Sequence, residues 1–183
     1  MAIGRYLALL RGINVGGKNI IKMADLKACF EDMQFTNVAT FIQSGNVVFQ
    51  SKKSDTSRLE SMIEKALLKA FHCSSMVVIV SHRQLQNIVK LAPEGFGSEP
   101  QQFRYDVVFP KVPLTPAEVL AQISLKEGVD EAHAGKLALY FSRLSIRATQ
   151  SRLSRITALP IYQQLTIRNW NTTTKLLTLM DRT

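Results

Sequence analysis

Polar and basic side chains with the chemistry of a binding site gather in two short segments of the first fifty residues. They are Arg11, Asn14, Lys18, Ser44 and Asn46. Arginine and lysine supply positive charge, while asparagine and serine supply hydrogen-bond donors, so this set suits a phosphate or a carboxylate. Several glycines stand among them and leave room for a ligand to approach the backbone. We therefore predict a site for an anionic ligand here.

A purely structural role for the same residues is the alternative. Asn14, Ser44 and Asn46 have short polar side chains that can hydrogen-bond to nearby backbone and so hold the loops in shape. Arg11 would then pair with a carboxylate and carry no ligand. Both interpretations fit the sequence.

A second candidate set is Arg168, Asn169 and Trp170, which stand between an apolar run and a helix expected at residues 172–180. The N-terminus of a helix presents free amides and the positive end of its dipole, which favour anions. The structural alternative makes Asn171 or Thr172 the helix cap and Trp170 a large core residue.

Other chemistries fit the sequence less well. Residues 12–18 match the G-x-x-x-x-G-K pattern of a nucleotide-binding loop, but Asn19 stands where a magnesium-binding serine or threonine is needed. An RNA-recognition module needs aromatic residues on its central strands, and only Tyr6 is well placed. The three histidines, His72, His82 and His133, are scattered without metal-ligand spacing. We predict no metal and no cofactor, and we assign no catalytic residue.

The elements that must position the first set follow from hydrophobic patterning. Apolar runs typical of strands occupy residues 6–10, 38–42, 47–49 and 76–80, and helical periodicity occurs at residues 26–33 and 59–71. The order is βαββαβ, that of a ferredoxin-like unit. In such a unit the third strand lies antiparallel between the first and second. The loop after the first strand and the loop before the third are then neighbours, which brings the predicted anion site together.

The same order recurs in the second half of the chain. We predict strands near 103–109, 129–133, 137–141 and 165–168, a helix from Thr115, and a helix near 151–164 that Pro160 kinks or splits. The fold class is therefore α+β with two ferredoxin-like (βαββαβ) halves, and we hypothesise an internal duplication. We place the first half at residues 1–91, a Pro- and Gly-rich connector at 92–102, and the second half with its C-terminal helix at 103–183.

Composition and charge define the class of partner. The 183 residues are 46% hydrophobic and carry a net charge of +9. Residues 133–183 contain 8 Lys or Arg and 1 Asp or Glu, which favours nucleic acid or a small anionic ligand as partner; a solvated basic face is the alternative. The apolar runs are too short for a membrane span, and two cysteines suit a reducing compartment. We expect a cytoplasmic protein without membrane partners.

Read together, four segments of the chain resemble one known family. The segments are ALLRGINVGGKN at residues 8–19, KMADL at 22–26, FIQSGNV at 41–47 and TIRNWNT at 166–172. They are similar to the bacterial family known as domain of unknown function 1697. The resemblance implies an α+β fold with a ferredoxin-like part and no established reaction, substrate or cofactor. The residues that match its motif positions, none with a known role, are Arg11, Gly12, Asn14, Gly16, Lys18, Ser44, Gly45, Asn46, Arg168, Asn169 and Trp170.

The sequence therefore favours a binding protein for a phosphorylated or nucleic-acid ligand, with the loop after the first strand and the Ser44 turn as its site. The alternative is a small metal-independent enzyme that acts on an anionic metabolite, in which Lys18 or Arg11 stabilises developing charge. An acidic or histidine side chain within reach of the site would favour the enzyme, because proton transfer needs such a group. A broad basic surface without one would favour nucleic acid.

Overall fold

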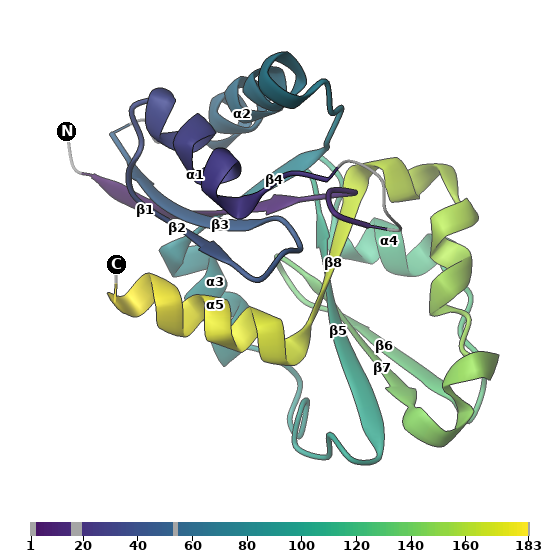
Figure 1. Cartoon of the computed structure of the whole chain (residues 1–183). Coiled ribbons are helices and arrows are strands. Elements are labelled where there is room, and N and C mark those ends of the chain that lie inside the picture. Colours follow the sequence, from purple (N-terminus) through teal and green to yellow (C-terminus); the bar gives the residue numbers. More distant parts are fainter. Residues whose placement is uncertain (1–2, 16–19, 53–54, 183) are drawn as a thin grey trace. The chain divides into compact units, whose positions relative to one another are not determined.

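The computed structural model describes residues 3–15, 20–52 and 55–182 (Figure 1). The chain forms two compact units, residues 1–85 with 176–183, and residues 86–175. The divisions fall within helix α3 (His82–Lys90) and helix α5 (Trp170–Arg182). The division into halves at 1–91 and 103–183, with a connector at 92–102, stays a prediction.

The first unit is built on one antiparallel sheet with the strand order β2-β3-β1-β4. Its elements are β1 (Gly4–Leu10), α1 (Met23–Asp32), β2 (Thr36–Phe41), β3 (Asn46–Ser51), α2 (Thr56–Phe71) and β4 (Val77–Ser81). Figure 1 shows α1 and α2 on the same face of this sheet. The order of elements and strands is that of a ferredoxin-like fold, as the hydrophobic pattern predicts.

The core between this sheet and its helices explains why the pattern folds in this way. Phe30 of α1 and Phe49 of β3 are fully buried, with ring centroids 5.5 Å apart in an edge-to-face arrangement. The ring centroids of Phe35 and Phe49 lie 4.4 Å apart, so three aromatic rings fill the space under α1. Helix α2 begins after Asp55, whose carboxylate accepts a hydrogen bond from the Arg58 amide.

The second unit contains a second antiparallel sheet with the order β6-β7-β5-β8, which is equivalent to that of the first. Its elements are β5 (Phe103–Pro110), α4 (Pro116–Gln122), β6 (Asp130–Ala134), β7 (Leu139–Leu144), three short 3-10 helices η1 (Ser145–Gln150), η2 (Leu153–Ala158) and η3 (Pro160–Gln164), and β8 (Leu165–Asn169). The fold is therefore α+β with two ferredoxin-like halves, which confirms the sequence prediction.

The helix predicted near 151–164 consists of two 3-10 segments, η2 and η3, which are divided before Pro160, as the prediction of a kink or split there requires. Pro160 lacks an amide hydrogen and sits at the first position of η3, where it ends any continuous helix. The segments nevertheless bury Leu153, Ile156 and Ile161 against one face of the second sheet, together with α4. Helix α4 begins after Thr115, as predicted, and it has a capping box in which the Thr115 side chain and backbone exchange hydrogen bonds with Glu118.

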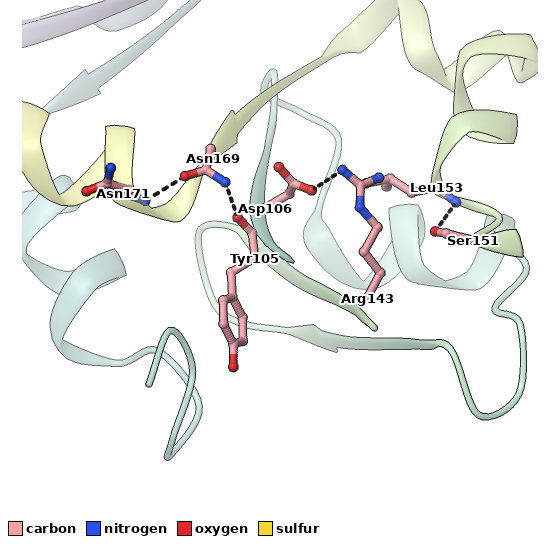
Figure 2. Close-up of polar contacts among 7 residues, drawn as sticks. All are labelled: Tyr105, Asp106, Arg143, Ser151, Leu153, Asn169 and Asn171. Carbon is pink, nitrogen blue, oxygen red and sulfur yellow. Dashed lines mark hydrogen bonds and ion pairs between the residues drawn. The ribbon is translucent and has the colours of Figure 1, made fainter. Parts of the chain in front are cut away.

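Strand alternation divides β5 between the two faces of the second sheet. Val108 lies in the core under α4 and the 3-10 segments, so Arg104 and Asp106 point to that same face. Tyr105 points to the opposite face. Figure 2 shows its ring on the other side of the strand from the Asp106 carboxylate. No helix in the described ranges is long and apolar enough to cross a bilayer.

Candidate functional site

The first unit brings the two predicted loops to the same end of its sheet. Leu9 pairs with Asn46 across β1 and β3, and the Leu10 amide donates to the Gly45 carbonyl at 2.8 Å. Gly45 has a φ of 73°, and a Cβ there would lie 2.9 Å from both Ile13 and Leu10. The close approach of the two loops therefore requires glycine at this position. Lys18 lies outside the described residues, as do Gly16 and Gly17.

Asn14 uses its side chain to tie the loop after β1 to its surroundings. Its Nδ2 donates to the carbonyls of Ile21 and Gln43, each at 3.0 Å, and its Oδ1 accepts from the Ile21 amide at 2.7 Å. The residue adopts a left-handed φ of 54°. These bonds are the structural role considered for Asn14, since they engage both donor and acceptor groups with backbone.

Asn46 and Ser44 shape the turn between β2 and β3. Asn46 is fully buried, and its Nδ2 donates to the Phe41 carbonyl at 3.2 Å and to Ser44 Oγ at 2.9 Å. The turn is therefore held by its own polar side chains. Because Asn46 has no exposed surface, it stabilises the shape of the turn.

Arg11 follows β1 and is half-buried. Its amide donates to the Met76 carbonyl at 2.9 Å, and its own carbonyl accepts from Ser75 Oγ at 2.8 Å. The backbone of Arg11 is thus fixed by the segment before β4. Its guanidinium and Lys18 supply the positive charge of the predicted anion site, which stays a prediction.

Arg168 and Asn169 end β8 and hold the junction with α5. Arg168 Nη1 donates to Thr166 Oγ1 at 2.7 Å and to the Ile167 carbonyl at 2.9 Å. Burial lowers the pKa of Arg168 to about 10, so the guanidinium is still charged at neutral pH. These two bonds lie within its own strand and contribute to the structure of β8.

Helix α5 begins at Trp170, two residues earlier than predicted, and Asn169 is its cap in place of Asn171 or Thr172. Asn169 Oδ1 accepts from the Asn171 amide at 2.9 Å, while its Nδ2 donates to the Tyr105 carbonyl at 3.1 Å (Figure 2). Capping by Asn169 is favoured because one side chain then bonds both the helix and β5. The first turn of α5 is thereby fixed against the second sheet.

A cavity of about 600 Å³ lies beside this first turn of α5. Asn169, Trp170 and Asn171 line it together with Arg104 and Tyr105 of β5. The structure thus places two of the three predicted residues of this cluster, Asn169 and Trp170, around one cavity. Arg168 is not among the residues that line it.

Arg104 and Arg143 form a cationic pair, and Arg104 is not among the site residues predicted from the sequence. The two residues lie directly opposite each other across β5 and β7. A further cavity of about 300 Å³ is lined by both arginines and by Ser145, Ile146, Ala148 and Thr149. Arg104 therefore borders both cavities. The sequence feature that could have indicated Arg104 is the run FRYDVVF at 103–109, in which two charged residues alternate with apolar ones in one strand.

Asp106 partly balances this positive charge from the same face of β5. Its Oδ2 lies 3.1 Å from Arg143 Nη2, and the alignment is that of an ion pair and not of a hydrogen bond (Figure 2). Burial raises the pKa of Asp106, while Arg143 and Arg104 act in the opposite direction. Arg143 Nε is buried and has no hydrogen-bond partner in the described part of the chain. The pair is therefore incompletely satisfied.

The other arginines of the basic C-terminal third have different surroundings. Arg147 and Arg155 are exposed. Arg152 donates its amide to Asp130 Oδ2 at 2.8 Å and its Nη1 to the Leu125 carbonyl at 3.2 Å. The guanidinium of Arg152 thus already binds backbone, while Arg147 and Arg155 face solvent.

Residues 3–15, 20–52 and 55–182 contain no cluster of side chains that could hold a metal ion. In that part of the chain no three His, Cys, Asp or Glu side chains gather as potential ligands. The three histidines occupy separate places, and His82 Nε2 lies 2.6 Å from Asp181 Oδ1, a hydrogen-bond distance. What the site offers is fixed positive charge and hydrogen-bond donors.

The fold and these cavities define an α+β protein with two ferredoxin-like halves and arginine-lined cavities in the second. A family model described as "protein of unknown function (DUF1697)" matches residues 3–140, and the chain belongs to this family. Its structure is similar to that of the conserved bacterial protein SP0830 from Streptococcus pneumoniae. The TM-score is 0.84 and the identity 26%, over 98% of this chain and 99% of that chain. No curated protein matches significantly.

Proposed function

We propose that this protein binds an anionic, phosphate-bearing ligand at Arg104 and Arg143. The observation that carries the proposal is the placement of the two arginines opposite each other in the β5–β7 ladder. Like charges directly opposite in a sheet destabilise it. Asp106 pairs with Arg143, and Asp130 lies opposite Arg143 on β6, so an anion in the cavity would balance the charge of Arg104.

The chemistry of the lining supports the same ligand class. Guanidinium groups match the geometry of phosphate oxygens, and the hydroxyls of Ser145 and Thr149 are further donors beside them. The other cavity bordered by Arg104 lies at the first turn of α5, where free amides and the helix dipole also favour an anion. Two anion-favouring features thus converge on Arg104.

Arg104→Ala tests this proposal, because Arg104 is exposed and we expect its removal to leave the fold intact. The matched control is Arg58→Ala, which removes an equally charged side chain that is 85% exposed on α2. We expect a labelled single-stranded oligonucleotide to bind wild type at low salt, followed by fluorescence anisotropy. Arg104→Ala should weaken binding and reduce the slope of log K against log salt by up to about 1. Arg58→Ala should not.

Competition identifies the ligand class. Displacement of the oligonucleotide by inorganic phosphate or a nucleoside monophosphate at comparable occupancy indicates a small phosphorylated ligand. Resistance to both, with a steep dependence on salt, indicates nucleic acid. Identical binding by wild type and Arg104→Ala would contradict the proposal.

The first-unit loops are a second proposed location for the same function. Arg11 and Lys18 would supply the charge there. Near Arg11, the side chains of Asn14 and Asn46 hydrogen-bond to the backbone of Gln43 and Phe41. Arg11→Ala in the same assay distinguishes the two locations. A loss of binding with Arg11→Ala alone would assign the ligand to the first unit.

The enzyme alternative has one supporting observation, the buried Asp106 carboxyl beside two arginines. A raised pKa is a property of general acids and bases. Asp106 is, however, not among the residues that line either cavity bordered by Arg104. Binding without chemistry is therefore the better-supported function.

We also propose that the protein resides in the cytoplasm. Cys29 and Cys73 are both free thiols, as expected in a reducing compartment. Burial raises the pKa of each thiol, and Asp32 raises that of Cys29 further. Both are therefore protonated and unreactive at neutral pH. Cell fractionation with an antibody against the chain tests the location.

A further inference from the structure

The opposite face of the second sheet contains a cavity of different character. Its volume is about 460 Å³, and it lies between the segment at 93–99 and strands β5, β6 and β7. Tyr105, Ser142 and Glu131 point into it from neighbouring positions in the sheet. None of these residues belongs to the arginine-lined cavity on the Asp106 face.

Aromatic rings form the wall of this cavity, and they are held rigidly. Phe96 packs edge-to-face against Tyr105, Tyr140 and Trp170, with ring centroids 4.9, 5.3 and 5.1 Å away. The Tyr140 hydroxyl donates to the Ile88 carbonyl at 2.7 Å, which fixes that ring. Gly97 has a φ of 89°, and a Cβ there would clash with the Trp170 indole. The wall is preorganised for the apolar part of a ligand.

Ser142 contributes a hydroxyl to the same cavity. The residue is 8% exposed, and no hydrogen bond formed by the described residues uses its hydroxyl. The hydroxyl is not one of the fully buried side-chain atoms without a partner, so it is accessible from the cavity. A polar ligand atom there could form a hydrogen bond with it.

The charge of the lining is opposite to that of the protein. Glu94, Glu99 and Glu131 line the cavity with His133, and none of the described residues lining it is lysine or arginine. Three carboxylates concentrated at one cavity of a chain with net charge +9 create a local negative potential. Aromatic walls combined with carboxylates are suited to organic cations.

We propose that this cavity binds a small organic ammonium ion, with its apolar body against the Phe96 and Tyr105 rings and its charge near Glu131. The Ser142 hydroxyl would bond a polar atom of the same ligand. This site shares no lining residue with the cavity that both Arg104 and Arg143 line, and its charge is opposite; with the cavity beside α5 it shares Phe103 and Tyr105.

Choline is the probe for this proposal, and its neutral isostere 3,3-dimethylbutan-1-ol is the matched control. Trp170 is the only tryptophan and packs against Phe96, so its fluorescence reports binding, and isothermal titration calorimetry gives the affinity. We expect choline to saturate the protein at about 1–10 mM, which is typical for so few ligand atoms. The neutral isostere should bind at least about fivefold more weakly, since it lacks the charge that the carboxylates attract.

Three variants locate the site. Glu131→Gln and Ser142→Ala should each weaken choline binding by about two- to tenfold, the effect of one hydrogen bond or one nearby charge. Glu127→Gln, an equal loss of charge at an exposed position outside the cavity, should leave it unchanged. Circular dichroism establishes that each variant is folded.

The proposal is overturned if choline does not saturate the protein, if the neutral isostere binds equally well, or if Glu127→Gln and Glu131→Gln have the same effect. Arg104→Ala separates this outcome from that of the proposed function. This variant should reduce anion binding and leave choline binding unaltered, so that one proposal can be contradicted without the other.

Discussion

The strongest energetic prediction concerns the pair between Asp106 and Arg143. Their side chains are 10% and 23% exposed, and the facing atoms are 3.1 Å apart. Arg143→Ala would leave the Asp106 carboxylate buried without its cation. Breaking a buried pair in this way costs about 3–5 kcal/mol. Because nearly a quarter of Arg143 reaches solvent, we expect the lower end, about 3 kcal/mol at pH 7.

Urea denaturation followed by circular dichroism measures this loss. The double variant Asp106→Asn/Arg143→Ala is the control, because a neutral amide needs no counter-ion. It should recover about half of the loss or more. A change of about 3 kcal/mol corresponds to a decrease of roughly 6–12 °C in Tm for a chain of this size.

The dependence on pH provides a second check on the same pair. The pKa of Asp106 is raised in the fold because burial disfavours the charged form. A carboxyl with a raised pKa favours folding most at acid pH, and that contribution is lost as the pH rises through the folded pKa. Arg143 lowers the pKa of Asp106 and so opposes the effect of burial. The loss of stability caused by Arg143→Ala should therefore be largest at pH 7 and should shrink towards pH 5, where protonation neutralises the carboxylate. A loss below about 1 kcal/mol at pH 7, or one independent of pH, would refute the reasoning.

Three further outcomes are expected. Phe49→Ala should lower the free energy of unfolding by about 3–5 kcal/mol in urea melts, because it leaves a cavity among buried rings; a loss under about 1 kcal/mol would mean that the core relaxes around it. Thr115→Ala should lose about 1 kcal/mol with the α4 capping box, whereas Thr157→Ala, which removes an exposed hydroxyl, should lose less. Limited proteolysis should cut first within 93–102, as mass spectrometry of early fragments would show, and first cuts elsewhere would contradict the predicted connector.

The order of elements could be predicted from the sequence because each depends on neighbouring residues. Strand runs such as residues 6–10 and the helical stripe of α2 follow from local hydrophobic spacing. The capping box at Thr115 is likewise local, since its partners stand three residues apart. The proximity of Gly45 to Leu10 followed once this order was assigned, because strand order in a ferredoxin-like unit joins those two loops.

Strand register and burial depend on the tertiary structure, and they determined the candidate sites. Arg104 and Arg143 are 39 positions apart and meet only because β5 and β7 pair in one register. The roles of Asn14 and Asn46 were open until their partners were known, since a short polar side chain suits a ligand or a backbone group equally. The aromatic and acidic cavity likewise depends on the tertiary structure. Phe96, Tyr105 and Glu131 come from three separate segments, and only folding brings their side chains around one space.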